Sequence, residues 1–474
     1  MRTTLLTVLS LVCCLAARAQ PADTLYLPLG EPVEQVRAAS DTTQRYAVYL
    51  PAGYRTDRVF PILFLMDPRG RALVPIERFR ASAERYGYVL LSSHQTLSDA
   101  DSAWAVNGRA LNAMVQDAQI RFSVDTRRFY IAGFSGTAHY AWFAASFLDG
   151  HLAGIVNSGD GLPVTSASVG DALGMTRPPA YFNAAALGDF NYDAARLRDR
   201  ALDTTRVPHR FVTFPGDHAW LPAALADEAM TWMQYQAMRT GMARYDAPWI
   251  DSLRVAHIAE ARRLDEAGRY VEAIRRYREV AADFEGRGDI SFVRDRIAAL
   301  ESDPAARAAI DMDASITQRI WAYSNVVIQF LDEYRTATRL PRTRLALARL
   351  QIPRLQEEAE DARHPDLAAG ARRMLATTYG SVAFYEPRDY MAAGDFERAA
   401  GLLRVARAMR PDGGACFWLA LSEAQLGRAD DAIDALTCAI DGQQVTRERI
   451  DTEPLLEPLR ADRRYAALVA RAPK

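Results

Sequence analysis

Short apolar segments alternate with amphipathic ones between residues 44 and 240, and this alternation constrains the fold more than any other feature of the chain. The apolar segments read as strands, and several are almost continuously apolar, as expected when both faces of a parallel sheet are covered. They cover residues 44–51, 60–67, 88–93, 128–135, 152–159, 180–187 and 209–216. Segments with helical spacing lie between them, at 76–86, 107–121, 137–148, 193–203 and 222–240. This order predicts an α/β domain with a doubly wound, mostly parallel sheet.

The sequence changes character at about residue 250, where strand-like segments stop and Ala, Leu, Arg and Glu recur at helical spacing. One frame, with glycine first and alanine sixth, occurs three times, as GRYVEAI (268–274), GDFERAA (394–400) and GRADDAI (427–433). The last two copies are 33 positions apart, close to the 34-residue period of tetratricopeptide repeats. An ordinary helical bundle with Gly and Ala at its turns is the alternative. Residues 305–390 are expected to be helical but show no clear repeat.

The length of 474 residues exceeds what a single core usually holds and predicts several domains. We expect a cleaved signal peptide over 1–19 and an α/β domain over 20–243. A helical region over 250–390 is expected to contain one possible repeat unit near 255–285. Tetratricopeptide-like repeats are expected over 391–474, giving an all-α domain after the α/β domain.

The first twenty residues have the three parts of a secretory signal. A positive Arg2 precedes an apolar stretch over 5–16, and small residues follow up to a predicted cleavage site before Gln20. A membrane anchor is the alternative, but the stretch is too short to span a bilayer. A lipoprotein signal fits less well, since Val12 is not a small residue before Cys13. We expect an exported protein, periplasmic or secreted, without an integral membrane segment after cleavage.

The net charge and the sequence motifs limit the kinds of partner and cofactor to expect, and the cysteines allow a disulfide. The net charge of −2 offers no basic surplus for nucleic acid. No metal-binding motif and no glycine-rich phosphate loop occurs, so we expect neither a metal site nor another cofactor. Cys416 and Cys438 remain after cleavage, near opposite ends of two paired helices. They either form a disulfide, as an oxidising compartment allows, or pack as two thiols.

A serine between glycines ends the predicted strand 128–135 and opens the next helix. This is the context of a nucleophile elbow, a strained turn that exposes a hydroxyl above the carboxyl edge of the sheet. Gly133 and Gly136 supply the small neighbours that the crowded turn needs, although Thr137 stands where the common pattern has glycine. Ser135 is therefore the candidate nucleophile.

A serine hydroxyl needs a base that an acid holds in place, and in such sheets the three residues follow the order Ser, acid, His. Asp189 comes directly after the strand 180–187, and His218 follows the strand 209–216. Both lie at carboxyl ends of strands, where open α/β sheets carry their sites. Alternatively, Asp189 caps the following helix and Asp193 is the acid.

An oxyanion intermediate would need backbone N–H donors. We expect one from Gly136 and one from Arg69, with Gly70 as the alternative, because Pro68 in the loop after strand 60–67 has no N–H. The side chains expected to line a substrate pocket are Phe134, Trp220 and His94.

Residues 44–240 resemble the alpha/beta-hydrolase esterases, especially the group with feruloyl esterases, acetylxylan esterases and polyhydroxybutyrate depolymerases. The segments that carry the resemblance are YAVYLPAGY, FPILFLMDPRG, VDTRRFYIAGFSG, LGDFNYD and PGDHAW. The resemblance implies Ser135 as nucleophile, His218 as general base and Asp189 as its orienting acid. Thr137 and the DPRG loop depart from the commonest pattern.

Three functions remain open at this point. The first is an exported serine hydrolase that cleaves a small carboxylic ester, with a repeat tail that binds a protein, the cell surface or its own hydrolase domain. The second is a catalytically inactive binding protein that acts through its repeats. The third is a serine peptidase of the same fold.

Overall fold

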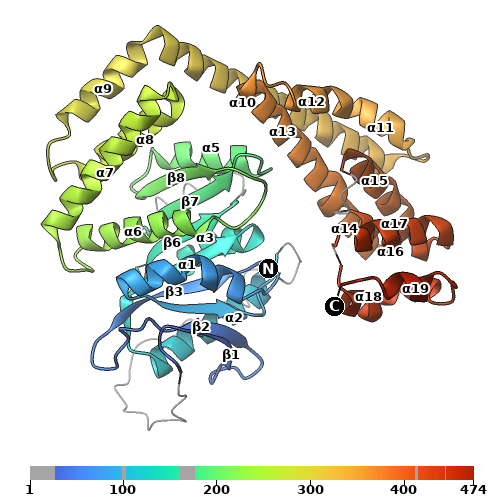
Figure 1. Ribbon diagram of the computed structural model, residues 1–474, viewed down its shortest axis with the longest axis horizontal. Helices are drawn as coiled ribbons and strands as arrows, with labels where there is room; N and C mark the ends of the chain where they lie inside the picture. The colour runs from blue at the N-terminus through green and yellow to red at the C-terminus, as the bar shows by residue number, and fades with distance from the viewer. Residues whose placement is uncertain are drawn as a thin grey trace, which may run out of the picture.

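The computed structural model describes residues 27–98, 103–148, 150–160, 177–410, 415–443 and 445–473. The expected signal peptide lies outside these ranges. Figure 1 shows the two parts of the described chain: an α/β part built around one sheet, and helices that arch away from it and return towards it on the other side.

One eight-stranded sheet has the order β1-β2-β4-β3-β5-β6-β7-β8. Antiparallel pairing joins β1 to β2 and β2 to β4, and all other neighbours are parallel. Four inner strands, β3, β4, β6 and β7, are buried along their whole length, which explains their mostly apolar sequence. The strands are β1 (Pro32–Arg37), β2 (Arg45–Tyr49), β3 (Phe60–Met66), β4 (Val89–Ser93), β5 (Val124–Phe134), β6 (Leu152–Ser158), β7 (Ala180–Ala186) and β8 (His209–Phe214).

Helices cover both faces of the sheet. In β3, Leu63 and Leu65 pack with α1 and α6 on one face, whereas Ile62 and Phe64 pack with α2 and α3 on the other. The helices of this part are α1 (Leu73–Tyr86), α2 (Ala103–Arg121), α3 (Gly136–Phe147), α5 (Tyr192–Leu202) and α6 (Ala223–Arg239). The predicted doubly wound sheet is confirmed, and the architecture is that of the alpha/beta-hydrolase fold. The edge strand β1 was not predicted, because its half-exposed sequence PVEQVR carries no apolar run.

In the described ranges after residue 246, every regular element is a helix or a helical turn. The first four are α7 (Ala247–Glu266), α8 (Tyr270–Phe284), α9 (Ser291–Ser302) and α10 (Pro304–Thr336). Next come α11 (Thr343–Arg349), α12 (Ile352–Ala359), α13 (Pro365–Gly380), a π-helical turn (Ser381–Tyr385) and α14 (Glu386–Ala392). The last are α15 (Phe396–Met409), α16 (Cys416–Gln425), α17 (Ala429–Asp441), α18 (Arg447–Thr452), a 3-10 turn (Pro454–Leu459) and α19 (Tyr465–Val469).

The three glycines of the repeated frame lie between paired helices, as the frame predicts. Gly268, Gly394 and Gly427 have φ angles of 72°, 76° and 69°, a left-handed conformation that glycine adopts without steric cost. The alanines at the sixth position are fully buried in the helix pairs. Membership of these pairs in the tetratricopeptide family stays a prediction.

The helices after residue 246 belong to two apolar cores. The boundary between these cores does not coincide with the change in composition near residue 250. The core on one face of the sheet continues through α7, α8 and α9 as far as Ala306. A second core begins at Ile316 and takes in the remaining helices. Helix α10, with 33 residues and a length of about 50 Å, runs from the first core into the second. We call the part from residue 307 onward the helical tail.

A buried carboxylate fastens α8 to the sheet. Asp283 accepts hydrogen bonds from Arg210 of β8 at 2.6 Å, from Trp232 at 2.9 Å and from Gln236 at 3.0 Å. Arg210 is fully buried, so its charge has no access to water. A charge in that position is tolerated only with a well-placed partner.

The two remaining cysteines are joined. Cys416 at the start of α16 and Cys438 near the end of α17 form a disulfide with their Cα atoms 5.9 Å apart. Of the two alternatives that the sequence left open, the structure has the bonded one.

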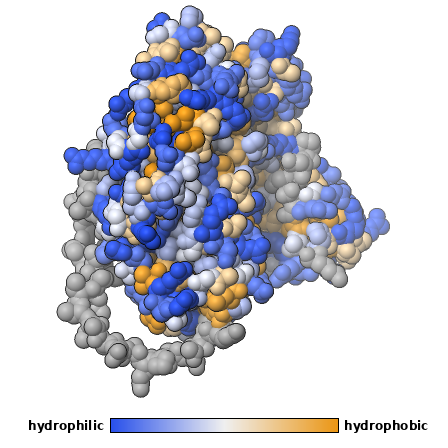
Figure 2. All heavy atoms as spheres, turned by 60° about the vertical axis from the view of Figure 1, so that its left-hand side comes forward, coloured by the Kyte–Doolittle hydropathy of each residue, from blue (hydrophilic) through white to orange (hydrophobic). Residues whose placement is uncertain are grey.

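The face shown in Figure 2 is mostly hydrophilic. On the face in Figure 2, hydrophobic residues form small separate groups among charged ones, as is usual for globular proteins. Among the helices of the described ranges, none combines the length and the apolar character needed to span a bilayer.

We expect Asp283→Ala to lower the free energy of unfolding by about 3 kcal/mol, because it removes the carboxylate hydrogen-bonded to the buried Arg210 and leaves Glu228 and Glu279 at 3.7 Å. Urea titration followed by circular dichroism measures this loss. Asp295→Ala, at an exposed position of α9, is the control and should change stability by less than about 0.5 kcal/mol. Equal effects of the two substitutions would contradict the role given to Asp283.

Candidate active site

Ser135 occupies a strained turn between β5 and α3. Its φ of 55° and ψ of −127° are rare for a residue with a side chain, and such strain concentrates at functional sites. Its backbone N–H donates to the carbonyl of Ser158 at 3.0 Å, which ties the turn to β6. The predicted elbow context is present, with the serine directly after the strand and before the helix.

The residues around the turn explain why the sequence has glycine and threonine there. A Cβ on Gly133 would lie 2.4 Å from the carbonyl oxygen of Thr137, so only glycine fits. The Thr137 hydroxyl accepts from the Phe134 N–H at 3.0 Å and lies within hydrogen-bond distance of the carbonyl oxygen of Met66. Threonine in place of the common glycine therefore braces the turn against the end of β3.

Three strand ends bring a hydroxyl, an imidazole and a carboxylate together. His218 Nε2 lies 2.9 Å from Ser135 Oγ, and its Nδ1 lies 2.9 Å from both carboxylate oxygens of Asp189. Asp189 is fully buried on its side chain, whereas the His218 side chain is 20% exposed. The imidazole can thus receive the serine proton while the buried carboxylate holds its other nitrogen.

Aromatic rings hold the imidazole from two directions. Phe134 lies 4.6 Å from the His218 ring and Phe190 lies 4.3 Å from it, both measured between ring centroids and both tilted by less than 40°. Trp220 packs against Phe134 at 5.7 Å. Phe134 and Trp220, expected to line a pocket, are only 7% and 5% exposed, so they support the site from within the core.

The loop after β3 is organised by a buried carboxylate. Asp67 accepts from the N–H of Arg69 at 2.9 Å, from the Arg71 side chain at 2.9 Å and from the Trp220 indole at 2.8 Å. The Arg69 N–H, expected to face an oxyanion, therefore points back into its own loop. Gly136 is the first residue of α3, so its N–H has no acceptor within the helix and stays aligned with the positive end of the helix dipole.

Two further residues singled out in the sequence lie elsewhere. His94 Nε2 is 2.8 Å from the carbonyl oxygen of Glu34 in the edge strand β1. Asp193, the alternative acid, pairs with Arg373 of α13 at 3.2 Å. Asp189 is the carboxylate that contacts His218.

Two residues that the sequence did not single out shape the pair of Asp189 and His218. A Cβ on Gly159 would lie 2.8 Å from Asp189 Oδ2 and 2.9 Å from His218 Cε1, and its φ is +59°. Asn191 donates its backbone N–H to Asp189 Oδ1 at 2.8 Å and its side-chain amide to the Gly159 carbonyl at 2.8 Å. In the sequence, the sign that could have pointed to Gly159 was its place as the glycine that ends the predicted strand LAGIVNSG.

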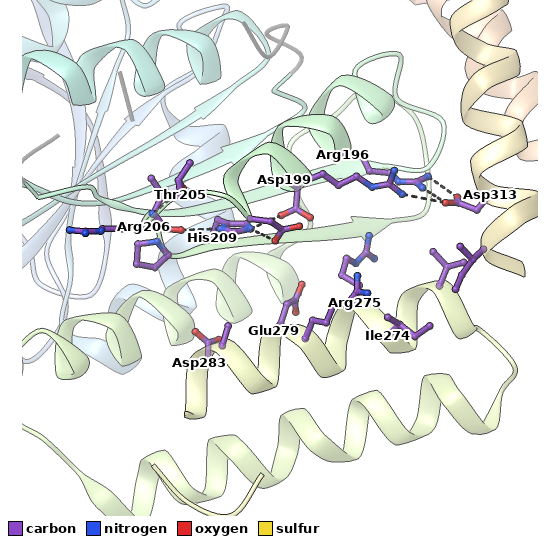
Figure 3. A pocket seen from close by; sticks show the side chains of 18 of the residues that line it. Arg196, Asp199, Thr205, Arg206, His209, Ile274, Arg275, Glu279, Asp283 and Asp313 are labelled. Carbon is purple, nitrogen blue, oxygen red and sulfur yellow. Dashed lines mark hydrogen bonds and ion pairs between the residues drawn. The ribbon is translucent and has the colours of Figure 1, made fainter. Parts of the chain in front are cut away.

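A cavity of about 470 Å³ lies at the opposite, amino end of β8 and does not include the three residues. In Figure 3, Arg196 points towards Asp313 of α10, and Asp199 faces His209. Burial raises the pKa of Asp199 to about 6. Asp313 also lies 3.7 Å from Arg200, and His209 lies 3.2 Å from Asp203, so these charges are taken up in ion pairs. Convergent reactive groups are found at Ser135 and not here. Within the described ranges, no cluster of three His, Cys, Asp or Glu side chains is arranged to hold a metal ion.

Comparisons with known proteins give only distant likenesses. No protein-family model and no curated protein sequence matches the chain. Among solved structures, a ferulic acid esterase shares 14% identity over 44% of this chain and 98% of its own, with a TM-score of 0.35. Esterase B from Lactobacillus rhamnosis shares 13% over 46% of this chain and 89% of its own, with a TM-score of 0.37. A putative dipeptidyl aminopeptidase IV from Bacteroides ovatus shares 13% identity over 43% of this chain and 35% of its own, with a TM-score of 0.34.

We expect Gly159→Ala to push His218 away from Asp189 and to slow inactivation by diisopropyl fluorophosphate by about 100-fold, the scale of a misplacement near 1 Å. Gly150→Ala is the matched control, because Gly150 has a φ of +80° but open space around its Cβ position. Both substitutions carry the same kind of backbone strain, and only the first touches the pair. Equal inactivation rates for the two variants would show that Gly159 does not shape the site.

Proposed function

We propose that this chain is a serine hydrolase that cleaves carboxylic esters through an acyl-enzyme. The observation that carries the proposal is the strained Ser135, whose hydroxyl lies 2.9 Å from an imidazole held by a buried carboxylate. A serine needs such a base to become a nucleophile near neutral pH. The resemblance of residues 44–240 to esterases selects the ester among possible acyl substrates.

In the first half of the reaction, His218 takes the proton of Ser135 as Oγ bonds to the carbonyl carbon of the ester. The imidazolium that forms is stabilised by Asp189 through Nδ1. His218 then gives its proton to the alcohol oxygen, the carbon–oxygen bond breaks and the alcohol leaves. The acyl group remains bound to Ser135.

In the second half, His218 removes a proton from water, and the resulting hydroxide oxygen bonds to the acyl carbon. The proton then returns to Ser135 Oγ, the acyl–serine bond breaks and the carboxylic acid leaves. The partial exposure of His218 supports this step, since water reaches the imidazole.

The negative oxygen of each tetrahedral intermediate requires donors that are already in place. The N–H of Gly136 and the amino end of α3 suit this role, because helix amino ends favour negative charge. A second donor from Arg69 remains part of the proposal and requires its bond to Asp67 to open when substrate binds.

We also propose that the protein is exported, to the periplasm or outside the cell, after removal of residues 1–19. The disulfide between Cys416 and Cys438 supports an oxidising compartment. The paired helices of the tail, if they are tetratricopeptide-like repeats, would offer a surface for a protein partner.

We expect Ser135→Ala and His218→Ala each to lower kcat/KM for p-nitrophenyl acetate by at least about 1000-fold, because nucleophile and base act as one unit. Initial rates of p-nitrophenol release measure this. Ser252→Ala, an exposed position on α7, is the control and should leave the rate unchanged.

Other outcomes would favour the alternatives. No hydrolysis by the wild-type protein, across acetyl, longer acyl and feruloyl esters, would favour an inactive binding protein. Faster cleavage of peptide anilides than of esters would favour a peptidase. A near-normal rate in either triad variant would refute the assigned roles.

Export has its own test. When the full chain is produced in a bacterial host, we expect the mature protein in the periplasmic or medium fraction, with Gln20 as its first residue. Fractionation and amino-terminal sequencing measure this. A cytoplasmic protein that keeps Met1 would contradict export and leave the hydrolase proposal untouched.

A further inference from the structure

The loop that carries the acid of the triad is held by the helical tail. This acid loop, residues 189–193, begins with Asp189 and ends with the first two residues of α5. Its contacts come from α13 and the π-helical turn after it, which lie about 180 residues further along the chain. Figure 1 shows this end of the tail returning to face the carboxyl ends of the central strands.

The first contact is an ion pair with little access to water. Arg373 of α13 lies 3.2 Å from Asp193, and the two side chains are 7% and 12% exposed. The same guanidinium lies 4.7 Å from the centroid of the Tyr192 ring. Removing either partner would leave a poorly hydrated charge without its counterion, so the pair links this end of the loop to α13. The cation–π contact adds to this link.

The second contact reaches the base. The Phe190 ring packs against the end of α13, where a Cβ on Gly380 would lie 3.8 Å from it. Tyr385, the last residue of the π-helical turn, meets Phe190 edge-to-face with 6.3 Å between ring centroids. On its other side Phe190 lies 4.3 Å from the His218 ring. An unbroken path of contacts therefore runs from the tail to the imidazole.

The π-helical turn gives this path its geometry. Residues 381–385 join α13 to α14 with one wide turn, a form that is rare in proteins and frequent at functional sites. Tyr385 meets Phe190, whereas Phe384 stacks on Trp418 within the tail, with 5.4 Å between ring centroids.

We propose that the helical tail completes the active site, with Tyr385 as a positioning residue that fixes His218 through Phe190. The inference rests on the proposed function, because positioning matters only if His218 is the base. A ring that packs on an imidazole restricts its rotation, and a misplacement near 1 Å can cost about 100-fold in rate. The tail is then part of the catalytic unit and not only an appendage for partners.

The test compares four variants of the full chain on p-nitrophenyl acetate. Tyr385→Ala should lower kcat about tenfold and leave KM within about twofold, the pattern of an interaction needed in the transition state. Tyr385→Phe keeps the ring and should restore the wild-type kcat. Trp321→Ala, at an exposed aromatic position of α10 in the tail, is the control and should match wild type. Tyr385→Leu replaces Tyr385→Ala if the latter does not fold.

A double-variant cycle tests the route through Phe190. If Tyr385 acts through that ring, Tyr385→Ala should add no further loss of kcat to Phe190→Ala. Additive losses, an unchanged kcat in Tyr385→Ala, or a change in KM alone would each overturn the proposal. If wild-type protein hydrolyses the ester and Tyr385→Ala does so equally well, only this inference fails. If wild-type protein hydrolyses no ester, the proposed function and this inference fail together.

Discussion

The close approach of β5 to α3 at Ser135 is the constraint on which the rest of the site depends. Glycine is the only residue type that fits at position 133, beside the Thr137 carbonyl. The positive φ of Ser135 lifts its hydroxyl out of the turn. Thr137 and the Ser158 carbonyl hold this strained conformation from two sides. Strain of this kind persists only where surrounding contacts over-determine it, and here both neighbouring strands take part.

The remaining contacts place the base and the acid against that hydroxyl. Rings pack on His218 from Phe134 in the sheet and from Phe190 in the acid loop. The first ring belongs to a strand of the sheet, whereas the second, Phe190, packs in turn against Tyr385 of the helical tail. The buried bond between Asp283 and Arg210 joins α8 to the sheet in a similar way. The core on that face of the sheet continues through α7, α8 and α9, so these helices are structurally continuous with the α/β part.

The sequence predicted seven of the eight strands and the order of the three reactive residues, because buried strands and strand ends leave local signals. Contacts between distant segments leave none. The hydrogen bond from the Arg69 N–H to Asp67 depends on the conformation of the loop after β3, which the sequence does not reveal. That Tyr385 would meet Phe190 depends on packing between segments 195 residues apart. Thr137 looked like a departure because its hydrogen bonds appear only in three dimensions.

A crystal structure of the protein inhibited by a fluorophosphonate would test the central claim most directly. The account predicts one covalent bond, from phosphorus to Ser135 Oγ, with the phosphonyl oxygen facing the Gly136 N–H and His218 within hydrogen-bond distance. An adduct on another residue, or no adduct in protein whose Ser135 and His218 remain 2.9 Å apart, would contradict it.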